Sequence, residues 1–268
     1  MKITTLLENK TTCDALRCEH GLSLYIETAK HKILFDSGAS DAFWENAKAL
    51  GIDLAQVDIA FLSHAHNDHC GGLLTFLRGN RTAKVYLQKE AFGDYYVVTP
   101  TKCAFIGLDP KLHEYADRFV MAEGVTKLDE ELTLFSGIRT HELLSEANAT
   151  LREKVGGDYP RDAFRHEQDL LVTEHGKTVL FAGCAHSGII NIINRAEDIL
   201  FAGFHLYNPS LGQSEPRALV DAVGERLRAR KATRYVTGHC TGDDAYAWLH
   251  ETLGDRLAYM ATGTTFTI

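Results

Sequence analysis

The chain has 268 residues, of which 45% are hydrophobic and 24% charged, so it can bury a core in one large α/β domain or two small ones. Its formal net charge of -8 and the absence of any basic run argue against RNA or DNA as a substrate. No apolar segment reaches the roughly 20 residues that span a bilayer, and no signal-peptide pattern opens the chain. We therefore expect a cytoplasmic protein without membrane contact, whose six cysteines are reduced.

Strand and helix patterns alternate through the first third of the chain. Ser40 can cap a helix that runs through residues 41–50 and that Gly51 can end. A second helix is expected at residues 71–78. Short runs with partial alternation or continuous apolar character predict strands at residues 2–7, 22–28, 32–35, 57–63 and 84–88.

The strongest motif follows the apolar run at 57–63 and reads Ser63-His64-Ala65-His66-Asn67-Asp68-His69. In an extended stretch, His64 and His66 point to the same side, so they can bind one ion together. If the chain turns into a helix near residue 68, Asp68 and His69 face a neighbouring position, where a second ion fits roughly 3.5–4 Å away. Imidazole and carboxylate donors suit zinc, manganese or iron. We therefore expect a two-metal site.

The second half of the chain repeats the alternation of strands and helices. Two stretches, 97–117 and 141–166, show no regular pattern, and such insertions usually cover an active site or are partly mobile. The economical picture is a single domain over residues 1–268, with helices outside β layers. We expect strands at 169–175, 178–183, 199–204 and 234–238, and helices at 187–196, 215–229 and 243–253.

Three later strands end in residues that can bind metal or substrate. His239 follows the run 234–238 in the same strand-to-loop setting as His64, and we expect it to be a ligand. His186 is a further expected ligand, because imidazole suits all three metals. Cys184 can serve as a thiolate ligand beside it or be a small buried residue. His205, which ends the run 199–204, is assigned to substrate binding or proton transfer, with a supporting hydrogen bond as the alternative.

The motif His64-x-His66-x-Asp68-His69 resembles the signature of the metallo-β-lactamase superfamily. This resemblance covers essentially the whole chain and implies an α/β (α+β) fold, a four-layer αββα sandwich with the metals at one edge. Asp36 resembles the early Asp-x-Gly turn, which normally supports the ligands from behind. Three further motifs are similar to those of the metal-dependent hydrolases that include the archaeal dihydropterin–ribofuranosylaminobenzene phosphate synthase: Gly183-Cys184-Ala185-His186-Ser187-Gly188-Ile189, Gly203-Phe204-His205-Leu206 and Thr237-Gly238-His239-Cys240-Thr241-Gly242.

The chain departs from the superfamily pattern at one position. Most members supply a bridging Asp from a strand-end Gly-Asp, whereas this strand ends in Gly183-Cys184. Glu167, just before the apolar run 169–175, is a candidate replacement carboxylate or supporting group. His239 matches the superfamily's final ligand. The other histidines have no such setting, and we expect them at the surface: His20, His31, His113, His141, His166, His175 and His250.

Two divalent ions, zinc first and manganese or iron as alternatives, lower the pKa of a shared water towards about 7. We therefore expect a hydrolase that attacks a small phosphorylated or anionic substrate, such as a phosphoester or phosphodiester, with metal-bound hydroxide. Asp68 would bind the second metal and accept a proton. The alternatives are a synthase like the one in the resembled subfamily and a metal-dependent sensor without turnover. A pterin substrate would need aromatic surfaces, for which the insertions offer Tyr95, Tyr96, Phe105, Tyr115 and Tyr159.

Overall fold

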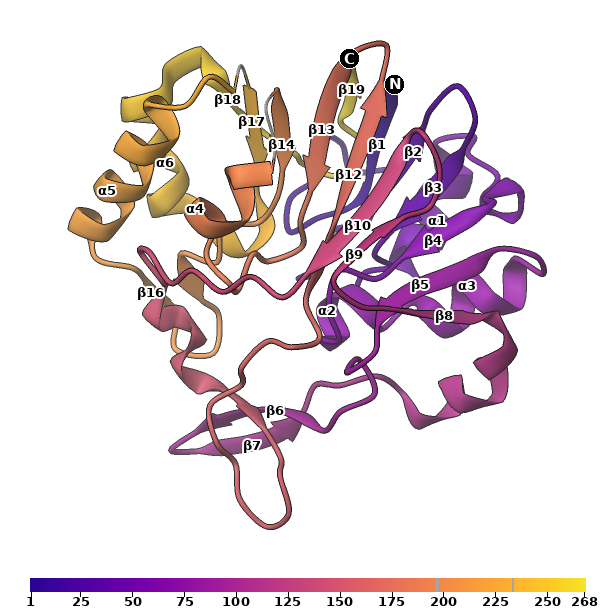
Figure 1. Cartoon of the computed structure of the whole chain (residues 1–268), viewed down its shortest axis with the longest axis horizontal. Helices are drawn as coiled ribbons and strands as arrows, with labels where there is room; N and C mark the ends of the chain where they lie inside the picture. Colours follow the sequence, from indigo (N-terminus) through magenta and orange to yellow (C-terminus); the bar gives the residue numbers. More distant parts are fainter. Residues whose placement is uncertain (196–197, 233) are drawn as a thin grey trace.

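A computed structural model describes residues 1–195, 198–232 and 234–268. Within these residues, two large mixed sheets face each other and helices cover their outer faces (Figure 1). The first sheet contains, from edge to edge, β19 (Thr265–Thr267), β1 (Lys2–Leu7), β2 (Ser23–Glu27), β3 (Lys32–Phe35), β4 (Ile59–Phe61), β5 (Lys84–Gln88) and β8 (Phe119–Ala122). The second contains β18 (Leu257–Tyr259), β17 (Arg234–Thr237), β14 (Ile199–Phe201), β13 (Lys177–Phe181), β12 (Gln168–Glu174), β10 (Leu132–Ser136) and β9 (Val125–Lys127).

The helices form the outer layers of the sandwich. The first sheet is covered by α1 (Ala42–Ala49) and α3 (Leu73–Gly79), and the second by α4 (Ile189–Ile192), α5 (Arg217–Arg228) and α6 (Asp243–Leu253). A short helix, α2 (Asn67–Cys70), lies at the end of the sandwich. Tighter 3₁₀ turns occur at Leu54–Gln56, Pro110–Arg118, Glu146–Thr150, Ile193–Arg195, His239–Thr241 and Gly254–Arg256.

Apolar side chains from the two sheets interlock to form the central core. Phe35 of β3 packs against Phe181 of β13 with ring centroids 5.9 Å apart, and Phe181 stacks on Phe201 of β14 at 5.3 Å. Burial of these large rings is the main favourable contribution to sheet packing. The four-layer αββα sandwich expected from the sequence is confirmed.

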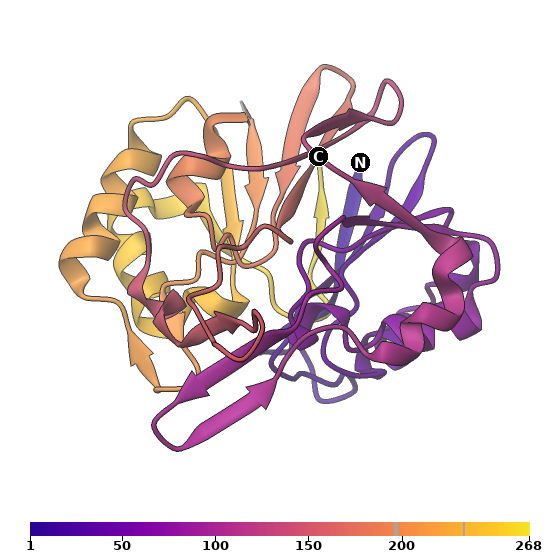
Figure 2. The ribbon, with the colours of Figure 1, turned by 60° about the horizontal axis from the view of Figure 1, so that its bottom comes forward.

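The two stretches predicted to be irregular pair with each other, and that prediction is wrong in part. Residues 97–117 include most of β6 (Tyr95–Thr99) and all of β7 (Lys102–Phe105), which form an antiparallel hairpin. From the other stretch, β11 (Leu151–Glu153) pairs with β6. We call β11, β6 and β7 the cap sheet, which projects from one end of the sandwich (Figure 2). Beyond it, β15 (Tyr207–Asn208) and β16 (Gln213–Ser214) form a short ribbon.

The strands that carry the candidate ligands run parallel. β3 pairs in parallel with β4, and β13, β14 and β17 form a parallel run in the other sheet. The carboxyl ends of parallel strands lie at one edge, where loops gather functional residues. The chain segments after these strands therefore meet at one end of the sandwich.

Most strands and helices expected from the sequence are present at shifted bounds. The helix expected at 187–196 is α4 followed by the turn Ile193–Arg195, and residue 196 lies outside the described residues. No strand was expected at β8, β9, β18 or β19, which are the edge strands of the two large sheets, or at the inner strand β10. No helix in the described part of the chain is both long and apolar enough to cross a membrane.

Candidate metal centre

The first group of converging donors consists of Asp68, His69, Cys184 and His239, whose ligand-type atoms all lie within 4.8 Å of one another. His69 Nε2 is 3.1 Å from both Cys184 Sγ and His239 Nε2. His239 Nε2 is in turn 3.2 Å from Asp68 Oδ2. Nitrogen, sulfur and oxygen donors at these separations can surround one tetrahedral cation.

A second group lies beside the first and shares Cys184. It consists of His64, Cys184 and His186, with His64 Nε2 3.3 Å from His186 Nε2. The His66 ring is close to both imidazoles, with centroids 4.7 Å from His64 and 4.8 Å from His186. The structure therefore brings together all the residues predicted as ligands, with Cys184 between the two groups and His186 in the second.

The hydrogen bonds behind the rings show that these donors fit cations. His69 Nδ1 lies 2.6 Å from Asp36 Oδ2, and His239 Nδ1 lies 3.0 Å from Asn9 Oδ1. His186 Nδ1 likewise lies 2.8 Å from Asn148 Oδ1. Because these oxygens accept the Nδ1 protons, the Nε2 lone pairs are left pointing at one another. Lone pairs that converge in a buried site repel, and a cation between them removes the repulsion.

Burial favours the neutral form that a metal requires. It lowers the pKa of His64 and His186 well below the usual range, and neighbouring histidines lower both further. Burial alone would raise the pKa of Asp68, but His69, His20 and His239 hold that pKa well below its usual range. The site therefore presents neutral His64 and His186 beside a charged carboxylate. Burial alone would also lower the pKa of His69, but Asp36 and Asp68 raise it above its usual value.

Two buried carboxylates hold the ligand loops in place. Asp36 accepts hydrogen bonds from the backbone N–H and the hydroxyl of Ser63, both at 2.7 Å, besides the one from His69. Glu167 accepts from the backbone N–H of His186 at 2.6 Å and of Ser187 at 2.9 Å. Glu167 therefore supports the loop that carries His186, and its oxygens are not in either donor group.

His166 was expected at the surface, and that prediction is wrong. It is fully buried, its Nδ1 accepts the Ala65 N–H at 3.0 Å and its Nε2 lies 3.0 Å from Asp162 Oδ2. The His66 Nε2 atom is buried without a hydrogen bond and lies 3.6 Å from the same Asp162 oxygen. Asp162 and His166, which belong to the stretch 141–166, therefore hold in place the loop that carries His64 and His66. The pair lies in a segment without helix, so no local sequence pattern marks it.

The backbone adopts left-handed conformations where the ligands leave their strands. Positive φ angles occur at Asp36 (59°), Ala185 (56°), His205 (45°) and His239 (51°). Non-glycine residues take such angles at a cost of about 1–3 kcal/mol each, and these conformations cluster at functional sites. The sharp turns aim the side chains that follow β3, β13, β14 and β17 into the same space.

Comparisons with known proteins agree with this geometry. Residues 16–101 match the sequence model of the metallo-beta-lactamase superfamily. The structure superimposes with a TM-score of 0.83, at 24% identity, on Tm1679, a metal-dependent hydrolase of the beta-lactamase superfamily, covering 100% of this chain and 99% of the other. This chain has the metallo-β-lactamase fold. The resemblance predicted from the histidine motif is confirmed.

Two relatives come from Methanocaldococcus jannaschii. One is the 7,8-dihydropterin-6-methyl-4-(beta-D-ribofuranosyl)-aminobenzene-5'-phosphate synthase, 26% identical over 90% of this chain and 88% of the relative. The other is the uncharacterized protein MJ0448, 28% identical over 76% of this chain and 80% of the relative. The similarity to both extends far beyond the histidine motif.

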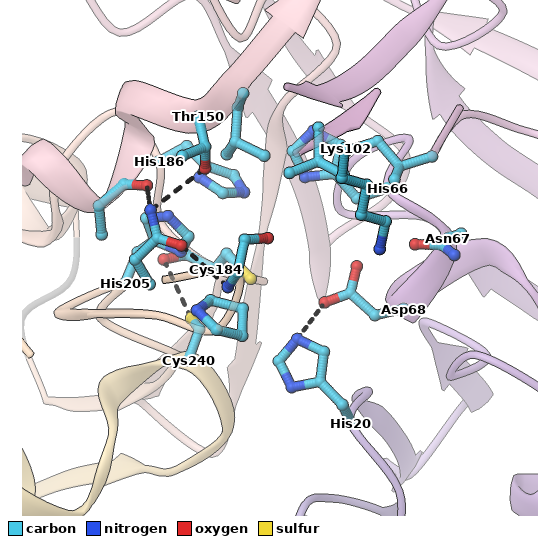
Figure 3. A pocket seen from close by; sticks show the side chains of 17 residues that line it. His20, His66, Asn67, Asp68, Lys102, Thr150, Cys184, His186, His205 and Cys240 are labelled. Carbon is cyan, nitrogen blue, oxygen red and sulfur yellow. Dashed lines mark hydrogen bonds and ion pairs between the residues drawn. The ribbon is translucent and has the colours of Figure 1, made fainter. Parts of the chain in front are cut away.

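In this metallo-β-lactamase fold a cavity of about 300 Å³ is lined by Asp68, Cys184 and His186 of the donor groups and by His66 (Figure 3). Lys102 of β7 is the one residue with a permanent positive charge among the described residues that line it. His20 also faces the cavity, with Nε2 3.3 Å from Asp68 Oδ2. The lining residues are His20, His66, Asn67, Asp68, Val97, Lys102, Ile106, Ala147, Thr150, Leu151, Cys184, His186, His205, Asn208, Pro209, Ser210 and Cys240.

The five aromatic residues available for a pterin surface pack elsewhere. Tyr95 is buried against the His166 ring, with centroids 3.9 Å apart. Tyr96 packs on Phe105 and Tyr159 at 5.5 and 5.1 Å. Tyr115 packs against the core beneath α3. None of them is among the described lining residues, so these rings do not offer a pterin surface to this cavity.

Proposed function

We propose that this protein is a dinuclear metal-dependent hydrolase acting on a small phosphorylated or anionic molecule. The observation that carries the proposal is the pair of donor groups that share Cys184 and line the cavity through Asp68, Cys184 and His186. One ion would be held by His64 and His186, with His66 beside them. The other would be held by Asp68, His69 and His239, and Cys184 belongs to both groups. Two such ions supply Lewis acidity and make water nucleophilic at neutral pH.

The chain's own side chains would bind the substrate and move a proton. Asp68, with a depressed pKa, would accept a hydrogen bond from the attacking water, and His20 beside it would hold the carboxylate in position. Lys102 offers an ammonium group to an anionic substrate. His205 lies at the back of the cavity, where it would contact the substrate. The apolar side chains of Val97 in the cap sheet and of Ile106, directly after β7, would exclude water from the reaction.

The composition of the site supports zinc, with iron as the alternative and manganese third. A cysteine sulfur shared by imidazole-rich groups favours softer cations over manganese. The size of the cavity and the net charge of -8 support a small-molecule substrate over a nucleic acid. We also propose a cytoplasmic location, in keeping with the exposed free thiols of Cys13, Cys18 and Cys103.

A synthase is the second candidate, and similarity to the methanogen synthase over 90% of this chain favours it. In that reaction the cations would organise anionic substrate groups. A metal-dependent sensor that binds a ligand without turnover is the third candidate.

The assay that separates these functions uses bis(4-nitrophenyl) phosphate with the zinc- or manganese-loaded protein. The hydrolase proposal predicts turnover that His66→Ala abolishes and that His250→Ala, at an exposed position on α6, leaves unchanged. Absence of turnover together with tight dihydropterin binding, measured by fluorescence quenching, would favour the synthase. Bound metal with neither turnover nor pterin binding would favour the sensor.

A further inference from the structure

A further donor group shares Cys184 with the two already described. The ligand-type atoms of Cys184, His205 and Cys240 lie within 4.8 Å of one another, and all three residues are buried. His205 and Cys240 belong to neither of the other groups. A set of two cysteines and one histidine matches a known type of three-ligand zinc site, in which a fourth position stays open.

The His205 ring is the independent sign that this group holds a ligand. Only 5% of His205 is exposed, and neither Nδ1 nor Nε2 has a hydrogen-bond partner. An imidazole with both nitrogens buried and unsatisfied has lost its hydrogen bonds to water without gaining others, which destabilises the folded state unless a ligand binds there. His205 is also held at φ 45°, so the chain accepts backbone strain to keep the ring there.

The loops around the group are built to bring the two thiols close. A Cβ added at Gly203 would lie 2.5 Å from Cys240 Sγ, so only glycine lets the chain after β14 pass this sulfur. Cys240 Sγ lies 3.7 Å from the carbonyl oxygen of Cys184. Cys184, His205 and Cys240 all line the cavity, so a cation among them would have an open side facing it (Figure 3).

We propose that Cys184, His205 and Cys240 form a third cation position for a thiophilic metal of the zinc class. Cys184 would be shared with the dinuclear groups, and His205 and Cys240 would belong to the third position alone. Coordination would deprotonate both thiols and satisfy one His205 nitrogen. The inference goes beyond the proposed hydrolysis and does not require it.

The test is the zinc content of the full-length protein after equilibrium dialysis, measured by mass spectrometry for the wild type and two variants. We expect three zinc ions per wild-type chain and two in both Cys240→Ser and His205→Gln. Cys103→Ser, which removes an exposed thiol of β7, is the matched control and should keep three. Two or fewer ions in the wild type, or three in either variant, would overturn the proposal.

Cobalt substitution gives a readout that depends on the bonds to sulfur. The thiolate-to-cobalt absorption of the wild type should weaken in Cys240→Ser and stay unchanged in Cys103→Ser. If Cys240→Ser does not fold, the wild-type stoichiometry and His205→Gln still decide. A Cys184–Cys240 disulfide in the native protein, found by peptide mapping, would also overturn the proposal. Phosphodiester turnover is measured separately, so an inactive protein with three zinc ions would refute only the proposed hydrolysis.

Discussion

Hydrogen-bonded oxygens behind the imidazole rings prepare this site for cations. The Asp36 carboxylate is an example, because it accepts from Ser63 and also fixes the proton of His69 on Nδ1. A ligand ring held in one tautomer and one orientation loses less entropy when it binds a metal. Asp36 therefore acts on the metal through His69.

Replacing Asp36 by asparagine should weaken metal binding about 10–100-fold, because the stronger carboxylate acceptor for the His69 proton is lost. The measurement is zinc affinity by competition with a chelator. Asp41→Asn changes an exposed carboxylate nearby, on the residue that precedes α1, and should have no effect. An unchanged zinc affinity in Asp36→Asn would remove Asp36 from the support of the site.

Asp68→Asn should leave the fold intact, weaken the second metal and cut turnover by orders of magnitude, since it removes both a ligand charge and a proton acceptor. Metal content and kcat are the readouts. Wild-type values for both would exclude Asp68 from the mechanism.

Lys102→Gln should raise KM for an anionic substrate about tenfold with little change in metal content, because the charge faces the cavity and lies outside the donor groups. Lys111→Gln, at an exposed position of the turn Pro110–Arg118, is the matched control. A KM equal to that of the wild type would show that Lys102 does not contact the substrate.

At the scale of elements, the ends of neighbouring strands press against each other around the ligands. Gly183 lies two residues beyond the end of β13, against the loop that follows β4. A Cβ there would meet Ser63 Oγ at 2.2 Å and His64 Nδ1 at 2.9 Å. The glycine therefore permits the close approach of the two sheets at the site.

Gly183→Ala should lower the free energy of unfolding by about 1–3 kcal/mol, because overpacking displaces Ser63 or His64, and it should also reduce zinc binding. Denaturant unfolding and metal analysis measure the two effects. Gly157→Ala has open space around its Cβ and should be neutral. If the two variants had equal free energies of unfolding, the loops that carry Gly183 and Ser63 could move apart without destabilising the protein.

The sequence predicts the αββα layers and the ligand set because both depend on local patterns. The apolar runs place His64, Cys184 and His239 after strands, and parallel strands bring those ends together. The cap sheet could not be predicted from local patterns, because β11 and β6 are separated by about fifty residues and pair through backbone hydrogen bonds. The burial of His166 could not be predicted either, because it depends on a partner distant in the sequence, the Ala65 N–H.

At the scale of the whole molecule, a histidine links the two sheets at the end opposite the cap sheet. His31, in the turn between β2 and β3, has Nδ1 2.9 Å from Asp58 and Nε2 2.6 Å from Asp129, which lies in the turn between β9 and β10. Only a protonated ring donates from both nitrogens. Burial alone would lower the pKa of His31, but the two carboxylates raise it above its usual value.

His31→Gln should therefore destabilise the protein in acid and not in base. Since the folded pKa is raised, the stabilisation is complete below the unfolded pKa of about 6.5 and disappears as pH rises through the folded value. We expect a deficit of about 1 kcal/mol, reduced by solvent screening, in urea unfolding with chelator present to keep the protein metal-free. A deficit that grows with pH would contradict the assignment, and His250→Gln serves as the control.

The central claim is that residues distant in the chain enclose a pair of cations at one end of the sandwich. Anomalous diffraction at the zinc edge from crystals of the zinc-loaded protein tests it most directly. We predict one peak beside His64 and His186 and another beside His69 and His239, both near Cys184. The third cation position proposed above would add a peak beside His205 and Cys240. An anomalous map with no peak among these imidazoles at saturating zinc would contradict the claim.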